Sequence, residues 1–218
     1  MSCALRQAII AAALEMRRLG LNRGSSGNIS VRTETGFLIT PSGMPPDKLR
    51  PEDIVAMDQE GTAQGRRKPS SEWRFHRDIY RARPDAGAVV HGHPPFCVAL
   101  ACLGKGIPAF HYMVAMAGGN DIRCAPYATY GTQALSDHAL AALDGRRACL
   151  LANHGMIALD RSLERALALA VEVEGLAEGY WRALQIGAPI LLDDAEMAVI
   201  LVKFASYGFN AQEPEQAP

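Results

Sequence analysis

The sequence predicts a single α/β domain in which helices pack in layers against a β-sheet. Apolar residues recur at helical spacing near both ends of the chain, and short apolar runs bounded by turn residues lie between them. Two of these runs are spaced as an antiparallel hairpin, which favours a mixed architecture over an all-helical one. With 218 residues, 49% of them hydrophobic and 21% charged, the chain is long enough to bury one substantial core.

A helix is predicted near the N-terminus, and it ends at Gly20, a residue suited to a left-handed terminating position. Its apolar face is formed by Leu5, Ile9, Ala12, Met16 and Leu19. Residues 28–31 and 37–40 predict two strands joined by a polar turn that contains Gly36. We expect this hairpin to lie at the edge of the sheet.

The rest of the chain alternates strands and helices. The predicted elements are a strand at 54–57, a helix at 71–82, a strand at 87–91, a short helix from Pro94 and Pro95 toward Leu103, a strand at 149–152, a helix at 163–184 and a helix capped by Asp193 and Glu196 that runs to about Ala205. Residues 209–218 include two prolines and two glutamates, and we expect them to form a flexible tail beyond a domain at 1–208.

The formal net charge of -1 gives no global electrostatic reason to bind nucleic acid or an anionic membrane. Arg6, Glu15 and Arg17 interrupt the first apolar stretch, which therefore does not match a signal peptide, and a cytoplasmic protein is expected. The five cysteines are scattered and lack the Cys-x-x-Cys spacing of metal or redox pairs. Buried, reduced thiols are the prediction.

Two histidines end an apolar strand, in the order Val89-Val90-His91-Gly92-His93. Residues two apart share a face of a strand, so both imidazoles can point at one ion. His154 also follows an apolar run, and three imidazoles with an open fourth position are typical of a catalytic zinc site. The alternative is that each histidine is a hydrogen-bonded structural residue, and the spacing alone does not decide.

Ser70, Ser71 and Glu72 lie at the expected start of the helix at 71–82. Free backbone N–H groups and the helix dipole attract a phosphate at such an end, although ordinary capping by serine explains the same pattern. The glycine- and serine-rich segments 24–28 and 40–43 supply further donors. Each segment is a weak signal alone, and together they could close around one phosphate.

Several segments spread over nearly the whole chain occur together in one order. They are Leu19-Gly-Leu-Asn-Arg-Gly, Leu38-Ile-Thr-Pro-Ser-Gly, Pro69-Ser-Ser-Glu-Trp-Arg-Phe-His, His91-Gly-His, Ile107-Pro-Ala-Phe-His-Tyr-Met, Ala125-Pro-Tyr-Ala-Thr-Tyr-Gly-Thr and Tyr207-Gly. In these segments the chain resembles the class II aldolase and adducin family, and most closely its aldolases for L-fuculose 1-phosphate. The resemblance implies one domain with a central, mixed and mostly antiparallel sheet flanked by helices.

The resemblance also implies the roles of individual residues. His91, His93 and His154 would bind Zn²⁺, or alternatively Mn²⁺ or Co²⁺, with Glu72 as a displaceable fourth ligand and the catalytic base. The implied phosphate pocket comprises Gly27, Asn28, Thr40, Ser42, Gly43, Ser70 and Ser71. Tyr112 corresponds to a tyrosine that handles the hydroxyl proton from a neighbouring subunit of a cyclic homotetramer, with active sites between subunits. Tyr207 matches a second catalytic tyrosine, which shapes the aldehyde end.

The implied reaction is reversible cleavage of a ketose 1-phosphate such as L-fuculose 1-phosphate into dihydroxyacetone phosphate and an aldehyde, here L-lactaldehyde. Gly92, Tyr130 and Asn153 depart from the family pattern and leave the aldehyde open. The main alternative is the same chemistry on 5-deoxyribulose or 5-(methylthio)ribulose 1-phosphate, which gives acetaldehyde or (methylthio)acetaldehyde in nucleoside by-product salvage. A pentulose-5-phosphate 4-epimerase, a methylthioribulose-1-phosphate dehydratase and a non-catalytic adducin-like scaffold are less favoured.

Overall fold

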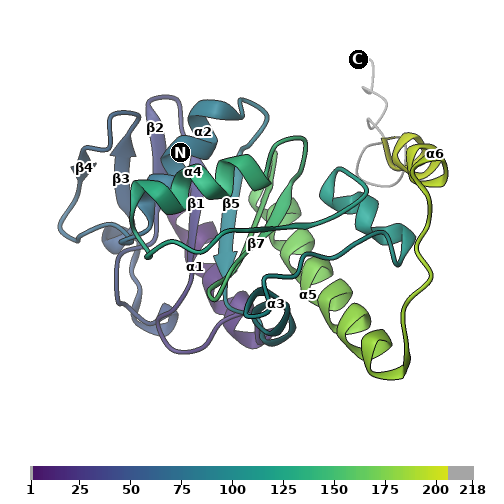
Figure 1. The fold of residues 1–218 in the computed structure, drawn as a ribbon. Helices are drawn as coiled ribbons and strands as arrows, with labels where there is room; N and C mark the ends of the chain where they lie inside the picture. The colour runs from purple at the N-terminus through teal and green to yellow at the C-terminus, as the bar shows by residue number, and fades with distance from the viewer. Residues whose placement is uncertain (1, 206–218) are drawn as a thin grey trace, which may run out of the picture.

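The computed structural model describes residues 2–205 of the chain (Figure 1). Its elements are, in chain order, α1 (Ser2–Arg18), β1 (Asn28–Arg32), β2 (Gly36–Ile39), η1 (Pro46–Lys48), η2 (Pro51–Asp53), β3 (Val55–Asp58), β4 (Ala63–Gln64), α2 (Trp73–Ala82), β5 (Ala88–Gly92), α3 (Pro95–Ala101), η3 (Tyr112–Ala117), β6 (Arg123–Ala125), α4 (Gln133–Ala142), β7 (Ala148–Leu151), β8 (Gly155–Asp160), α5 (Leu163–Ile186) and α6 (Asp194–Ala205).

The strands form one sheet in the order β4-β3-β2-β1-β5-β8-β7-β6. Neighbouring strands are antiparallel except β6 and β7, which run parallel. The prediction of a mixed, mostly antiparallel sheet is therefore confirmed. The central position of β5 places its C-terminal end, with the His91-Gly92-His93 segment, in the middle of the sheet rather than at its border.

The hairpin formed by β1 and β2 is present, with Ser30 opposite Ile39. Its expected place at the sheet edge is wrong, because β1 also pairs with β5 and β2 also pairs with β3. The hairpin is almost wholly buried, and both of its outer sides hydrogen-bond to strands from other parts of the chain. Such pairing between distant segments leaves no signal in the local pattern of the hairpin.

Other elements were missed or displaced. The sequence pattern did not predict β4, β6, β8 or α4, and β4 and β6 are too short, at two and three residues, for an alternation to show. The helix expected at 71–82 begins at Trp73 and has Glu72 as its N-cap. The predicted tail at 209–218 lies outside the described residues.

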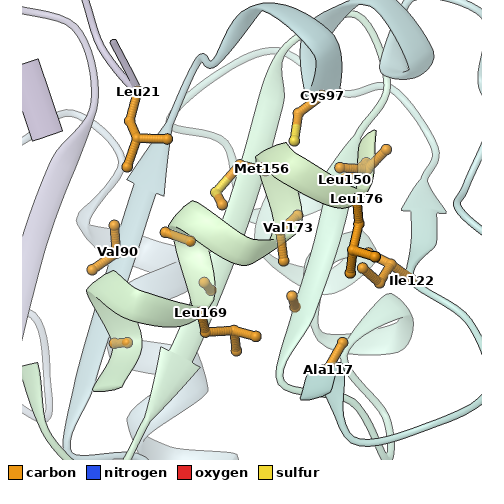
Figure 2. Close-up of a cluster of buried hydrophobic side chains, with 14 of the residues drawn as sticks. Leu21, Val90, Cys97, Ala117, Ile122, Leu150, Met156, Leu169, Val173 and Leu176 are labelled. Carbon is orange, nitrogen blue, oxygen red and sulfur yellow. The ribbon is translucent and has the colours of Figure 1, made fainter. Parts of the chain in front are cut away.

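Two hydrophobic clusters lie on opposite faces of the sheet. The larger cluster lies under α1, α3 and α5, and the smaller lies under α2 and α4 (Figure 1). Because side chains alternate along a strand, Val90 points to the larger cluster while Val89 and His91 point to the opposite face. Figure 2 shows Leu169, Val173 and Leu176 of α5 among the residues of the larger cluster. Burying each such side chain contributes roughly 1.5–3 kcal/mol, and this contact holds α5 against the sheet.

Helix α5 also fixes the chain that leaves the histidine segment. Its Glu174 carboxylate accepts hydrogen bonds from the backbone N–H groups of Phe96 and Cys97, both at 2.9 Å. These are donors in the first turn of α3 that have no partner within the helix itself. The carboxylate therefore holds the start of α3, and with it the end of β5, in a fixed position.

All five cysteines are free thiols, as predicted. Cys97 and Cys149 are buried, and burial raises the pKa of both thiols. Cys3 and Cys102 are exposed, which corrects the expectation of burial, because they lie near the chain start and at the end of α3. Among residues 2–205, no helix has the length and apolar character that crossing a bilayer requires.

Asp53 is a buried carboxylate just before β3 that pairs with Arg66 and Arg67. From these ion pairs we predict how the stability of the protein depends on pH. Hydrogen bonds from Arg67 and Arg66 lower the pKa of Asp53 to about 2, so its contribution is complete above its ordinary value near 3.8 and disappears as pH falls through 2. Asp53→Asn should lower the free energy of unfolding at pH 7 by about 1–2 kcal/mol, because both guanidinium groups are half exposed.

Urea unfolding of the parent and of the Asp53→Asn variant at pH 7 and at pH 2.5 measures this difference, which should shrink at the lower pH. Asp47→Asn is the matched control, because its ion pair with Arg17 is exposed on both sides and should change stability little. An Asp53→Asn penalty that stays constant over this range would contradict the assignment.

Candidate active site

Three histidines converge where β5, β8 and β7 meet. His91 lies in β5, His93 follows directly after the strand end, and His154 lies in the turn between β7 and β8. Their available ligand nitrogens all lie within 4.8 Å of one another, and the Nε2 atoms of His91 and His93 are 3.0 Å apart. The structure thus brings together the three histidines that the sequence placed at two strand ends.

Gly155 allows this close approach. A Cβ atom added to Gly155 would lie 2.3 Å from the carbonyl oxygen of Gly92 and 2.7 Å from Cδ2 of His93. Asn153 precedes His154 and has a φ of 54°, a left-handed conformation that asparagine tolerates better than most residues. The turn between β7 and β8 can therefore bend tightly enough to aim His154 at the other two rings.

The carboxylate of Glu72 lies against this cluster. Glu72 is the N-cap residue of α2 and is 6% exposed. Its Oε2 is 3.2 Å from Nε2 of His91, and its Oε1 is 3.3 Å from Nε2 of His154. Oε2 also accepts a 2.9 Å hydrogen bond from the amide of Asn28, whereas Oε1 is buried without a hydrogen-bond partner among the described residues. A buried, unpartnered carboxylate oxygen is costly unless a cation or substrate group compensates it.

The protonation states suit a group of metal ligands. Burial raises the pKa of Glu72, but the combined effect of the nearby His91 and His154 is larger and lowers it. The net pKa lies well below the usual range, so the group is a carboxylate. Burial, with repulsion from the other imidazoles, lowers the pKa values of His93 and His154 to about 4. Both rings are therefore neutral near pH 7 and have a lone pair to offer.

His91 has its second nitrogen fixed by the backbone. Its Nδ1 lies 2.9 Å from the carbonyl oxygen of Met156, to which it donates, and this leaves Nε2 pointing at Glu72 and His93. For His91 burial lowers the pKa, yet attraction to Glu72 outweighs it and the net pKa is raised. Three oriented imidazoles and one carboxylate with an unpartnered oxygen fit a divalent transition-metal ion.

A cavity of about 350 Å³ opens beside the cluster. Its lining residues are Ser25, Ser26, Gly27, Asn28, Pro41, Ser42, Gly43, Ser70, Ser71, Glu72, His93, Tyr127, Ala128, Tyr130, Asn153 and His154. All residues of the predicted phosphate pocket line this cavity except Thr40. Glycine- and serine-rich loops far apart in the sequence therefore surround one space next to the histidines.

The cavity offers neutral donors for an anion. The backbone N–H groups of Gly27, Gly43 and Ser71 have no hydrogen-bond partner within the described part of the chain. The N-terminus of α2 follows directly after Glu72, and its dipole favours negative charge at this end. No lysine or arginine is among the described lining residues, so a phosphate here would be held by backbone and hydroxyl groups rather than by an ion pair.

Two of the predicted phosphate residues have other contacts. The hydroxyl of Thr40 accepts from the backbone N–H of Ile29, and its carbonyl accepts from Ser70, so this buried residue braces the cavity wall from behind. Both polar atoms of the Asn28 side chain are engaged, with Nδ2 donating to Glu72 and Oδ1 facing His76. Asn28 therefore contacts the carboxylate directly, a role that the sequence did not suggest.

Of the two predicted tyrosines, only Tyr112 lies among the described residues. Tyr112 begins η3, is 50% exposed and lines a separate cavity of about 960 Å³ rather than the cavity beside the histidines. Tyr207 lies outside the described residues. Tyr127 and Tyr130 line the histidine cavity and are exposed, although sequence reasoning gave them no role beyond the departure noted at Tyr130. Their only sequence signal was the Ala125–Thr132 segment itself.

Comparison with known proteins agrees with this geometry. A family profile described as "Class II Aldolase and Adducin N-terminal domain" matches residues 7–181. The 5-methylthioribulose-1-phosphate/5-deoxyribulose-1-phosphate aldolase of Rhodospirillum rubrum is 63% identical over 211 residues, covering 97% of this chain and 96% of the relative. The L-fuculose phosphate aldolase of Escherichia coli is 52% identical over 210 residues, covering 96% and 98%. A solved structure of an L-fuculose 1-phosphate aldolase superposes with a TM-score of 0.91 at 41% identity, covering 94% and 97%.

Gly155 gives a direct test of whether the three histidines can bind a metal ion together. Gly155→Ala forces the new methyl group into Gly92 and His93, so the histidines must separate and affinity for zinc should fall by about 10–100-fold. Chelator competition on folded protein measures this affinity. Gly175→Ala, at an open position in α5, is the control and should bind zinc like the parent. Unchanged zinc affinity in a folded Gly155→Ala variant would refute the geometry.

Proposed function

Because the chain belongs to the class II aldolase and adducin family, we propose that it is a metal-dependent aldolase that reversibly cleaves a ketose 1-phosphate into dihydroxyacetone phosphate and an aldehyde. The observation that carries this proposal is the convergence of three imidazoles and the Glu72 carboxylate at the wall of a cavity rich in neutral anion donors. A non-catalytic scaffold would have no need to keep this set of groups together.

His91, His93 and His154 would hold the ion, with Glu72 as a displaceable fourth ligand. Zinc suits this donor set best, and manganese and cobalt are the alternatives. When bound, a divalent ion polarises the ketone and stabilises the negative charge that carbon–carbon cleavage leaves. The chain offers Glu72, rather than a lysine, as the group beside this reacting centre.

Glu72 is proposed to move the proton at carbon. Its low pKa keeps it a carboxylate at rest, and Oε1 has no hydrogen bond to break before it accepts a proton. In synthesis Glu72 would remove a proton from the carbon that bonds to the aldehyde. In cleavage Glu72, after taking up a proton from solvent, would give it to the carbon that loses the aldehyde. The phosphate would be held by Gly27, Ser42, Gly43, Ser70 and Ser71, with Thr40 and Asn28 supporting the pocket from behind and from the side.

Tyr112 is proposed to act across a subunit boundary. It is half exposed and lies outside the histidine cavity of its own chain, which is consistent with a residue that completes the site of a neighbouring subunit. Its phenolic oxygen would accept the proton of the substrate hydroxyl while the phenol releases its own proton to solvent, as the aldehyde leaves. We accordingly propose a cyclic homotetramer with active sites between subunits, in which Tyr207 shapes the aldehyde end.

The candidate substrates differ at the aldehyde end. The Rhodospirillum rubrum relative named for 5-methylthioribulose 1-phosphate and 5-deoxyribulose 1-phosphate is more similar to this chain than the Escherichia coli relative named for L-fuculose phosphate, at 63% against 52% identity. The first two substrates would give aldehydes without a hydroxyl group, whereas L-fuculose 1-phosphate gives L-lactaldehyde. We therefore rank 5-(methylthio)ribulose 1-phosphate and 5-deoxyribulose 1-phosphate above L-fuculose 1-phosphate as substrates.

A substrate panel tests the activity and this ranking together. Metal-loaded protein should release dihydroxyacetone phosphate from 5-(methylthio)ribulose, 5-deoxyribulose and L-fuculose 1-phosphates, with the first two giving the higher kcat/KM. A coupled dehydrogenase measures the release. Removal of the metal by a chelator should abolish turnover, and added zinc should restore it. Full activity after exhaustive chelation, or no cleavage of any panel member, would refute the proposal.

Mixed oligomers test the division of labour between subunits. Glu72→Gln should retain metal and lose turnover by about 10²–10⁴-fold, and Tyr112→Phe should also be strongly impaired. If each site takes Glu72 from one subunit and Tyr112 from the next, mixing and reassembling the two variants should recover about a quarter of parental turnover, because that fraction of sites is intact in a random cyclic assembly. Recovery no greater than the sum of the separate variants would contradict a shared site.

A further inference from the structure

A buried chain of hydrogen bonds leads from Glu72 into the protein interior. Oε2 of Glu72 accepts from Nδ2 of Asn28 at 2.9 Å, and Oδ1 of Asn28 lies 2.5 Å from Nε2 of His76. Nδ1 of His76 lies 2.6 Å from the hydroxyl of Ser30, which lies 2.8 Å from the hydroxyl of Tyr80. Every member is buried, and His76 and Ser30 are wholly inaccessible to solvent.

The five residues come from two elements that face each other. Glu72, the N-cap of α2, is followed at intervals of four residues by His76 and Tyr80 in the helix, so the three side chains lie along one side of α2. Asn28 and Ser30 are spaced two apart along β1, so they lie on one face of the strand. The bonds pass from helix to strand and back at each step, which makes the chain a seam between α2 and the sheet.

Both ends of this chain fix the direction in which its hydrogens point. At one end Glu72 is a carboxylate, which only accepts, so Asn28 must turn its N–H groups toward Glu72 and its oxygen toward His76. At the other end Ser30 is the hydrogen-bond partner of the Tyr80 hydroxyl, at 2.8 Å, and the described residues offer that hydroxyl no second acceptor, so Tyr80 donates to Ser30. Any reversal would leave Tyr80 with a buried, unpaired hydrogen and set two oxygens against each other at Glu72.

His76 is the residue at which these two constraints meet. It must donate from Nε2 to Asn28 and accept at Nδ1 from Ser30, which requires a neutral ring with its hydrogen on Nε2. Burial lowers its pKa to about 3, which agrees with a neutral ring. Only one of the two neutral tautomers satisfies every bond in the chain.

We propose that His76, backed by Ser30 and Tyr80, is a positioning residue that locks the amide of Asn28 so that it donates to Oε2 of Glu72 and leaves Oε1 as the proton-transfer oxygen. The two oxygens of the carboxylate thereby become inequivalent. This inference rests on the proposed function, because it concerns the proton that Glu72 moves. Neither His76 nor the two residues behind it, Ser30 and Tyr80, line the cavity, so they act through Asn28 and not on substrate.

A partial reaction isolates the step that Glu72 performs. Metal-loaded parent protein incubated with dihydroxyacetone phosphate alone in deuterium oxide should exchange one hydrogen of the hydroxymethyl carbon, and proton NMR follows the loss of that signal. His76→Phe, which keeps an aromatic ring but removes both polar atoms, should slow this exchange by about 10–100-fold, part of the 10²–10⁴-fold that general acid–base catalysis contributes. Cleavage kcat should fall by the same factor with KM and bound metal unchanged.

Milder variants keep the test decisive if His76→Phe does not fold. His76→Gln, whose amide can still donate to Asn28, should recover part of the exchange rate. Tyr80→Phe and Ser30→Ala should each slow exchange by a few-fold, because the direction of the chain is then less strictly fixed. Ser136→Ala is the matched control. It removes a buried 2.6 Å hydrogen bond from Ser136 to Asp78, which lies in α2 like His76, and it should lower Tm and leave the exchange rate unchanged.

A readout that does not depend on activity is the tautomer of His76. Long-range proton–nitrogen correlation spectra of uniformly ¹⁵N-labelled parent protein, assigned with His76→Gln, should show His76 neutral and protonated at Nε2. Protonation at Nδ1, or parental exchange rates in folded His76→Phe and Tyr80→Phe with only Tm reduced, would overturn the positioning role. Absence of both exchange and cleavage in the parent would instead overturn the proposed function, while the tautomer would still decide the orientation of the chain.

Discussion

The buried carboxylate of Glu72 is the constraint on which the site depends. A charged group with one unpartnered oxygen is unfavourable in a protein interior, and among residues 2–205 the neighbouring imidazoles and the Asn28 amide compensate for its burial. The α2 N-terminus supplies this group, the ends of β5 and the β7–β8 turn supply the imidazoles, and β1 supplies the amide. The sheet order therefore matters to the chemistry, because β5 must lie between β1 and β8 for the three sources to meet.

Two kinds of packing make this meeting possible. Apolar residues on both sheet faces hold α5 and α2 in place, and Gly155 lacks the side chain that would keep the start of β8 apart from the end of β5. Glu174 then anchors the chain after His93 by binding the first turn of α3. The imidazole nitrogens are thus positioned largely by backbone contacts, and the polar cavity beside them is built from loops whose donors are left free.

The sequence predicted much of this arrangement and missed the parts that depend on distant pairing. Helical periodicity located α1 and α5, and the His91-Gly92-His93 segment at a strand end identified two members of the cluster. Local pattern does not predict the interior position of the β1–β2 hairpin, the short strand β6, the contact of Thr40 with Ser70 or that of Asn28 with Glu72. Each depends on a segment more than 20 residues away. The role proposed for Tyr112 would depend on a second subunit, which a local sequence pattern does not describe.

The seam between α2 and β1 joins a helix and a strand, whose side chains recur at different spacings along the chain. Four helical residues advance about 6 Å, and two strand residues advance about 6.7 Å, so the repeats are nearly commensurate over the short distance from Glu72 to Tyr80. Side chains from the two elements can therefore alternate without a gap over that distance. One inserted or deleted residue in either element would put them out of step, even if both the helix and the strand still formed. A change of length in α2 or β1 should therefore disturb every bond of the seam at once, whereas a single substitution removes only the bonds of one member.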